Sequence, residues 1–598
     1  MAAPFIIFIL PFLLLAAFAL IGAAVVPSTV RGGCAYTRMA AGFAAFPILC
    51  VAPLYFSDSF IPTLTLTSLL IAAGLWKTRL RMPSSTPNVL FWIAVAANLL
   101  LLAWGTWSHT GLGDHDPYEH AMGVSYIFET GSIFPKGNDW MDFATLDPYP
   151  PGYDACAAAL ARLTGSVAFG LRLWAILCAA MFPMAVRFFA RASGLSERSS
   201  AVAGMVALFL PSAPTHFAWT HTMGISLTLV AAGSVWLLPH SRRWAPAGGM
   251  ALAALALSAS SDIFHSLFFL IPATTAVVRE KRFARAIAAV AIALLLCGYW
   301  GLHAYERISS MGTETLRSAT PKHFSTTRTH FDPPQEAQEP WYKKHHGNAR
   351  PYEAAEFLVP NWKNYFNAPV GLPAAAFIPG VAGLILLFYR RRAVWPLAVF
   401  ALLMVAVQGE RLPAEFFPHR IWSYLAVMVA IGCAAFLRYG NFRPGRAVAV
   451  IMALLVFLSL GHSVAVRVRM ESLQWINEIF TTQDQRDGYY RISETLRGEK
   501  IFPFAGGIRF GHVPAMGGRV TFWGESERAA AGLLEQRKFG EAIDTLKKAG
   551  YHYLILDSTI NLRLGANTMA ELYRTMAARP DYRVLSAGDD FTLFGEKK

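Results

Sequence analysis

Charged side chains are scarce in this chain. Only 15% of its 598 residues are Asp, Glu, Lys or Arg, whereas 55% are hydrophobic. This balance excludes an ordinary water-soluble globular domain. The six cysteines lie in or beside apolar segments without the spacing of a metal or redox motif, so they indicate nothing about function.

Several motifs of soluble enzymes are missing as well. The chain has no Walker-type glycine loop, no serine nucleophile elbow and no His-Glu-x-x-His zinc motif. An enzyme of this sequence therefore has no nucleotide site facing the cytoplasm. A donor used on the outer face, where nucleotide sugars are absent, must arrive attached to a lipid.

Long apolar runs take the place of these motifs, at lengths that can cross a hydrocarbon core of roughly 30 Å. The first, Phe5–Val26, lacks a basic leader and a small-residue cleavage site, so we expect it to be a retained span. The sequence predicts a polytopic α-helical membrane protein with about 13–14 transmembrane helices. The expected spans lie near 5–26, 38–56, 60–76, 88–106, 165–189, 199–211, 218–238, 246–258, 263–278, 284–302, 369–389, 394–408, 419–437 and 447–465.

The basic residues test this assignment, because cytoplasmic connections carry an excess of Lys and Arg. They fall in alternate connections, at Arg31 and Arg38, Lys77 to Arg81, Arg187 to Arg198, Arg242 and Arg243, Arg279 to Arg282, Arg390 to Arg392, and Arg438 to Arg446. The net charge of +14 therefore sets the topology, and we expect no nucleic-acid partner. The outer side then receives loops 107–152 and 303–368, the short loop 409–418 and the C-terminal tail.

The tail changes in composition after Arg467. The segments "EKIFPFAGG", "GRVTFWGE", "YHYLILDS" and "YRVLSAGDDFTLFGE" predict short strands, with a helical stretch near Glu525–Ala549. We therefore predict two domains. Residues 1–465 form the transmembrane domain, and 466–598 form a small extracytoplasmic α/β domain.

The first outer loop, Gly111–Gly152, is unusually acidic. It carries seven acids against one base, Lys136, and the acids are Asp114, Asp116, Glu119, Glu129, Asp139, Asp142 and Asp147. Pro117 favours an extended or turn conformation for Asp116, and a helix can begin after it. A carboxylate at the membrane interface can act as a general base or bind a divalent cation. The alternative is a solvated loop with helix-capping aspartates.

A second group, Arg411, His419 and Arg420, lies at the outer end of the thirteenth span. Arginine can bind a phosphate through two parallel hydrogen bonds. It can also anchor a helix at the headgroups, although a basic start on the outer side opposes the positive-inside rule. Both interpretations remain open.

A third group contains His216 and His221 in one outer connection and Asp262 and His265 near another helix end. Ionisable groups at membrane depth are candidates for function. The alternative is that they are ordinary loop residues. Glu314, in the long second loop, is a further candidate.

The acidic loop resembles the first extracytoplasmic loop of the GT-C membrane glycosyltransferases, and most of all that of archaeal-type oligosaccharyltransferase catalytic subunits. The resemblance rests on Asp116-Pro117-Tyr118 with His120, on "YIFETG" at Tyr126–Gly131, and on "YPPG" at Tyr149–Gly152. The chain departs from that family by lacking the Trp-Trp-Asp-x-Gly motif, and by having His216 and His221 where the family has acids. Three extra spans also precede the helix that matches the family's first.

The resemblance implies a GT-C fold and a glycosyltransferase. The donor would be a sugar or glycan on a polyprenyl phosphate, and the acceptor a glycan, lipid or protein at the outer face of a prokaryotic inner or plasma membrane. The transfer would be inverting. The alternatives are a transporter or flippase of lipid-linked glycans, and a protein oligosaccharyltransferase.

The resemblance also assigns roles to residues. Asp116 would be the catalytic base or the ligand of a divalent cation, Mg²⁺ or Mn²⁺, supported by Asp114 and Glu119. Donor-phosphate binding would fall to Arg420, with His419 and Arg411. The expected substrate-binding residues are His120, Tyr149, His221, Asp262 and Glu314.

Overall fold

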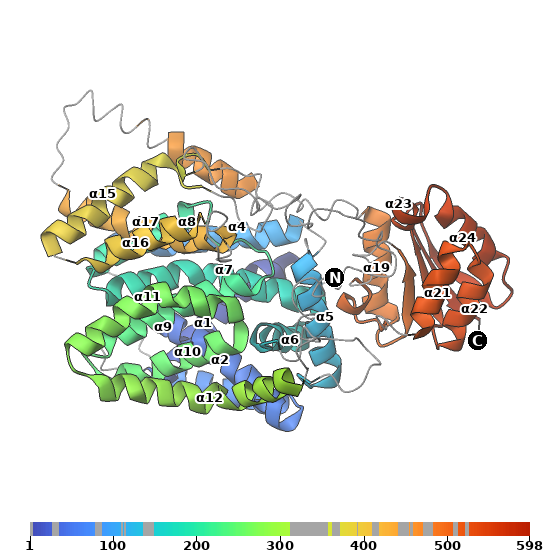
Figure 1. Cartoon of the computed structure of the whole chain (residues 1–598), viewed down its shortest axis with the longest axis horizontal. Coiled ribbons are helices and arrows are strands. Elements are labelled where there is room, and N and C mark those ends of the chain that lie inside the picture. The colour runs from blue at the N-terminus through green and yellow to red at the C-terminus, as the bar shows by residue number, and fades with distance from the viewer. Residues whose placement is uncertain are drawn as a thin grey trace.

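The computed structural model of the chain has a large helical body and a small α/β unit at the C-terminal end (Figure 1). It describes residues 4–26, 35–77, 86–108, 112, 115–134, 149–310, 357–360, 371–391, 393–408, 418–440, 454, 458–469, 482–505, 512–520 and 525–597.

Most helices of the body follow the predicted apolar runs. The helices are α1 (Pro4–Val25), α2 (Ala35–Ser57), α3 (Ile61–Lys77), α4 (Thr86–Ser108), α5 (His115–Thr130), α6 (Gly152–Thr164), α7 (Val167–Ala192), α8 (Glu197–Phe209), α9 (Thr220–Leu237), α10 (Ala245–Ser258), α11 (Ser260–Arg279), α12 (Phe283–Ser310), α15 (Ala374–Arg391), α16 (Trp395–Ala406) and α17 (Pro418–Tyr439). Of these, α5 and α6 lie between the fourth and fifth predicted runs. A helix also covers 458–469. Each of the fourteen predicted spans therefore overlaps a helix.

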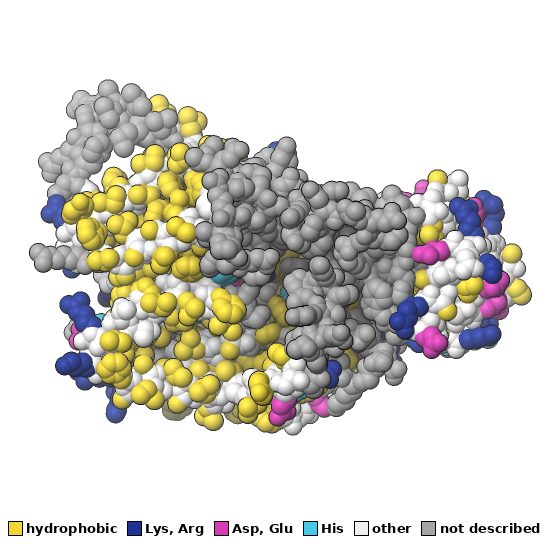
Figure 2. All heavy atoms as spheres, in the orientation of Figure 1, with side chains coloured by type: hydrophobic (Ala, Val, Ile, Leu, Met, Phe, Trp, Pro, Cys, Tyr) yellow, Lys and Arg dark blue, Asp and Glu magenta, His cyan; other side chains and the backbone are white. Residues whose placement is uncertain are grey.

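Eight helices within the described ranges are long and apolar enough to cross a membrane. They are α1, α2, α4, α7, α11, α12, α15 and α17. Their burial differs widely, because α7 is wholly enclosed by its neighbours whereas most of α12 is exposed. Figure 2 shows the resulting apolar surface over much of the helical body. An apolar surface of this extent suits contact with lipid.

Close helix contacts in the body depend on glycine. A Cβ at Gly383 of α15 would overlap the carbonyl oxygen of Gly432 on α17, and a Cβ at Gly22 of α1 would overlap that of Arg38 on α2. Small residues let backbones approach where lipid offers no hydrophobic drive for helices to associate.

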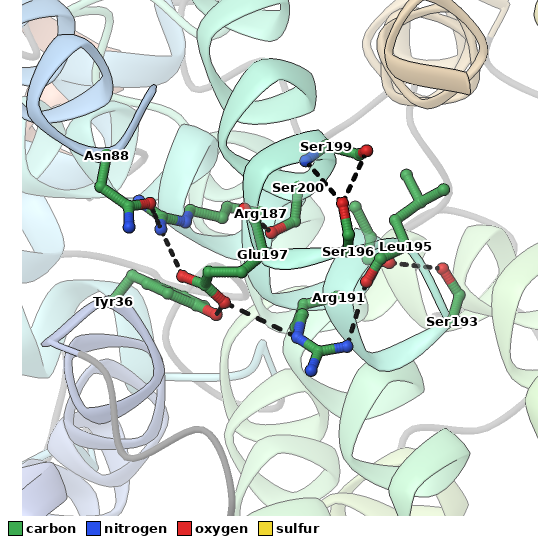
Figure 3. Close-up of polar contacts among 11 residues, drawn as sticks. Tyr36, Asn88, Arg187, Arg191, Ser193, Leu195, Ser196, Glu197, Ser199 and Ser200 are labelled. Carbon is green, nitrogen blue, oxygen red and sulfur yellow. Dashed lines mark hydrogen bonds and ion pairs between the residues drawn. The ribbon is translucent and has the colours of Figure 1, made fainter. Parts of the chain in front are cut away.

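A polar network joins four helices at the end of the body where α7 finishes and α8 begins (Figure 3). Arg187 of α7, which is 2% exposed, donates to Asn88 of α4 and to Glu197 of α8. Its guanidinium lies 4.2 Å from the ring centre of Tyr36 on α2, and the Tyr36 hydroxyl donates to Glu197. The network thus gives the arginine, which is buried among apolar helices, an acidic partner and a polar partner.

The C-terminal unit contains a four-stranded sheet in the order β1-β2-β4-β3. The strands are β1 (Ile501–Phe504), β2 (Tyr553–Asp557), β3 (Tyr582–Ala587) and β4 (Phe591–Glu596). β1 and β2 are parallel, whereas β4 pairs antiparallel with both β2 and β3. The helices are α19 (Gln483–Thr495), α20 (His512–Ala515), α21 (Glu525–Glu535), α22 (Phe539–Lys548), α23 (Ile560–Leu564) and α24 (Thr568–Ala577).

One predicted strand is described only in part. In the segment "GRVTFWGE", Arg519 forms an isolated parallel bridge with Lys500, and residues 521–524 lie outside the description. The helical stretch predicted near Glu525–Ala549 is two helices, α21 and α22.

The Arg187 network gives a testable prediction. Replacing Arg187 with Met should lower the free energy of unfolding by about 1–3 kcal/mol, because Asn88 and Glu197 lose a buried charged donor. Unfolding in mixed detergent micelles measures this. Arg191→Met is the matched control, since its exposed guanidinium lies 3.6 Å from the same carboxylate and should cost less than about 1 kcal/mol. Equal effects of the two variants would contradict the assignment.

Candidate active site

The predicted catalytic segment forms the start of α5. Asp116 is the second residue of this helix, so the expected extended or turn conformation is wrong. Pro117 does not interrupt the helix because N–H groups of the first turn have no partner within the helix to lose. The side chain of Asp116 and the whole of Asp114 lie outside the described residues.

His120 lies one turn beyond Asp116 on α5, so their Cα atoms share a helix face. Its Nδ1 lies 2.8 Å from Oδ1 of Asp154 on α6, and both side chains are buried. Burial raises the pKa of the Asp154 carboxyl, and His120 opposes this shift by its charge and hydrogen bond. The carboxylate fixes the orientation of the imidazole, as in other Asp–His pairs. Glu119, the neighbouring residue, is half-buried.

The segment "YPPG" leads into α6, whose first residue is Gly152. A Cβ at Gly152 would overlap the Ser258 hydroxyl at the end of α10, so glycine allows α6 to begin there. The Tyr149 hydroxyl lies 3.4 Å from the Thr220 hydroxyl at the start of α9. The ring centres of Tyr149 and His120 are 6.5 Å apart. The end of the acidic loop thus connects α5 with α9.

Arg420 lies near the same end of α9. It is the third residue of α17, partly buried, and its guanidinium lies 4.7 Å from the ring centre of Trp219. Trp219 immediately precedes Thr220, and its ring centre lies 4.8 Å from that of His221. A series of contacts therefore runs from His120 through Tyr149, Thr220 and Trp219 to Arg420.

A buried polar cluster, formed by His221, Asp262, His265 and Tyr424, lies beside Trp219. Asp262 Oδ1 lies 2.7 Å from His221 Nδ1 and accepts a 2.7 Å hydrogen bond from the Tyr424 hydroxyl. His265 Nδ1 lies 3.5 Å from the same oxygen. His221 is in α9, and Asp262 and His265 are in α11, so the alternative that they are loop residues is wrong.

The structure brings together five of the predicted site residues that it describes. His120 and Tyr149 lie at one end of the contact series, and Arg420, His221 and Asp262 at the other. The side chain of His419, and Arg411 and Glu314 altogether, lie outside the described residues. His216 is buried in the connection between α8 and α9. The hydrogen bonds described for the polar cluster join His221, Asp262 and Tyr424 and do not include His216.

Sequence reasoning missed four residues of this region. Asp154 carries a visible signal, since it is a lone carboxylate entering the apolar run "GYDACAAALA". Trp219, Tyr424 and Arg467 carry none. Arg467 is buried and donates to the carbonyls of Ala213 and Pro214, so it holds the connection that leads to Trp219.

The C-terminal unit contacts both ends of α5, which lies between α6 and that unit in Figure 1. At the first turn, the Tyr118 and His512 rings lie 3.7 Å apart between centres. At the last, Arg497 Nε lies 2.9 Å from a Glu129 carboxylate oxygen, and the guanidinium lies 4.2 Å from the Phe128 ring centre. These contacts restrict the position of the helix that contains Asp116.

We therefore predict that Arg497→Ala increases backbone amide exchange in the last turns of α5, because the helix loses an ion pair and a cation–π contact. Hydrogen–deuterium exchange with peptide-level mass spectrometry measures this. Arg491→Ala is the control, since Arg491 donates to the Leu585 carbonyl within the C-terminal unit. Unchanged exchange in α5 of the Arg497 variant would contradict a positioning role.

No protein-family model and no curated protein sequence matches the chain. Among solved structures, the chain is similar to ArnT from Cupriavidus metallidurans bound to undecaprenyl phosphate. The identity is 12% over 85% of this chain and 98% of that one, with a TM-score of 0.51. The apo state of the same protein gives 12% identity, the same coverage and a TM-score of 0.49.

The arabinofuranosyltransferase AftD from mycobacteria is also similar, at 15% identity and a TM-score of 0.49. The match covers 86% of this chain and 40% of that one. The likeness to undecaprenyl phosphate-bound ArnT shows the fold alone: the chain is mostly helical, has several candidate membrane spans, and resembles the GT-C fold of ArnT. None of the three structures is described as an oligosaccharyltransferase, so that part of the resemblance stays a prediction.

Proposed function

We propose that the protein is a membrane glycosyltransferase that takes a sugar or glycan from a polyprenyl-phosphate donor. One observation supports the proposal: a series of contacts runs from His120 of α5 through Tyr149 and Trp219 to Arg420 of α17. Asp116 in α5 would supply a carboxylate and Arg420 in α17 a guanidinium, and these are the two groups that such a transfer needs. The undecaprenyl phosphate bound to ArnT supports a donor of this class.

In the proposed reaction, Asp116 removes the proton of the acceptor hydroxyl. The acceptor oxygen attacks the anomeric carbon from the face opposite the phosphate, which inverts its configuration. The bond between the anomeric carbon and the phosphate oxygen breaks, and its electron pair leaves with the polyprenyl phosphate. Arg420 stabilises the charge that develops there by charge-assisted hydrogen bonds in a partly dry site.

The supporting residues act on these two groups. Asp154 orients His120, one turn from Asp116, and Glu119 and Asp114 add negative charge close to Asp116 in the sequence. A divalent cation would be held by the carboxylate of Asp116 and would supply Lewis-acid chemistry. The donor enters from the membrane, and the reaction takes place on the extracytoplasmic side, as the distribution of basic residues implies. The acceptor is a glycan, lipid or protein of the cell envelope.

Asp116→Asn should lower the rate of glycan transfer by about 10²–10⁴-fold, the usual contribution of a general base. Donor binding should be unchanged, because the amide keeps the size of the carboxyl. A transfer assay with purified protein and a lipid-linked sugar, together with donor-binding titration, measures both. Asp139→Asn is the control, as an acid of the same loop outside the motif. Full transfer by Asp116→Asn would disprove its role as the base.

Arg420→Ala should weaken donor binding by about 10- to 100-fold, because a phosphate loses a charge-assisted hydrogen-bond donor. Binding of undecaprenyl phosphate without sugar is sufficient to measure it. The matched control is Arg438→Ala, in the last turn of the same helix and about 27 Å from Arg420 along it. Equal loss in both variants, or none in Arg420→Ala, would contradict a phosphate site at the start of α17.

A further inference from the structure

His221, Asp262 and His265 form a group whose chemistry the proposed transfer does not use. The three side chains are buried, with Asp262 fully so. One potential metal-ligand atom from each lies within 4.8 Å of the others. Asp262 and His265 are three residues apart on α11 and project from one face, and His221 comes from the facing helix α9. Metal sites in helical bundles are built in this way, from an acid-x-x-His pair on one helix and a ligand on another.

The distances within the group suit a common ion. His221 Nδ1 and His265 Nδ1 lie 2.7 Å and 3.5 Å from Asp262 Oδ1. Donor atoms bound to a tetrahedral zinc at about 2.0–2.1 Å are separated by about 3.3 Å. The 3.5 Å distance is close to this separation, whereas the 2.7 Å distance is shorter, so His221 would move outward for both atoms to bind one ion.

Two polar atoms of the group have no hydrogen-bond partner among the described residues, namely Asp262 Oδ2 and His221 Nε2. A carboxylate in a water-poor helical body is costly unless a cation or enough donors compensate it. We propose that His221, Asp262 and His265 bind a divalent transition-metal ion, with Zn²⁺ as the fitting ion. Three protein ligands would leave one coordination position open.

The ligand types decide between classes of cation. Two imidazole nitrogens and one carboxylate oxygen suit Zn²⁺ and its neighbours, whereas Mg²⁺ and Ca²⁺ take oxygen ligands. The zinc site is therefore distinct from the Mg²⁺ or Mn²⁺ site expected at Asp116. The protein would keep its Zn²⁺ when Mg²⁺ is removed.

Surrounding residues hold the carboxylate in place. The Tyr424 hydroxyl donates to Asp262 and lies 3.4 Å from the Thr228 hydroxyl. A Cβ at Gly224 would overlap the Asp262 carboxylate, so glycine at this position of α9 makes the space it occupies. Outer partners of this kind orient metal ligands and tune affinity.

The bound ion would also add positive charge near the start of α17, because Trp219 lies between His221 and Arg420. Loss of the ion should then weaken binding of a donor phosphate. This consequence rests on the proposed function, whereas occupancy by the ion does not. Measuring metal content without donor therefore separates failure of this proposal from failure of the proposed function.

The experiment uses the purified full-length protein in detergent, with any affinity tag removed. The protein is stripped with chelator, incubated with Zn²⁺ alone, desalted, and analysed for metal by mass spectrometry. We expect about one zinc per chain. Substitution with Co²⁺ should give the visible absorption of a low-symmetry site. Tyr424→Phe should lower zinc affinity by about 10–100-fold.

Asp262→Asn and His265→Gln should lose the ion, and His216→Gln should retain it as a buried histidine outside the group. Size-exclusion chromatography checks folding. If Asp262→Asn fails to fold, the zinc content of His265→Gln tests the proposal. Absence of zinc above background in the natural protein would overturn the proposal and leave a hydrogen-bonded Asp–His cluster. Full retention of zinc by His265→Gln, or equal loss in His216→Gln, would also overturn it.

Discussion

The low-dielectric interior of the helical body constrains where its polar side chains can lie. A polar group there has no bulk water to bind, so it needs an internal partner or an ion. Arg187 meets this requirement at one end of α7 through Asn88, Glu197 and the ring of Tyr36. Asp262 meets it in part at the start of α11, where His221 and Tyr424 both bind its Oδ1. Both groups join helices that are distant in sequence, so pairing the charge also fixes the packing.

The candidate site follows from the same constraint. Its residues lie at helix starts, namely those of α5, α6, α9, α11 and α17, where polar residues can approach the substrate without crossing the apolar body. The residues between these starts are aromatic, with Tyr149 and Trp219 connecting His120 to Arg420. Aromatic rings provide both apolar area and a polar edge, which suits a site between lipid and water. The lipid-linked donor proposed for the protein presents the same combination.

The C-terminal unit is part of this arrangement. His512 and Arg497 contact the first and last turns of α5, so the unit restrains the helix that contains Asp116. A helix of 16 residues has little stability by itself in water. Its contacts with α6 and with the C-terminal unit therefore determine how firmly this helix is held.

The sequence by itself determined the helices of the body, because apolar length is a local property that the bilayer requires directly. It also predicted three strand-containing segments of the C-terminal unit, and it pointed to the segment from Asp116 to His120 and to Arg420 as candidates for the site. Only the tertiary structure decided that Asp116 is helical, since Pro117 is tolerated in a first turn. Only the tertiary structure paired His120 with Asp154, and Asp262 with His221 and Tyr424. These partners are 34, 41 and 162 residues apart, and helix packing rather than any local pattern brings them into contact.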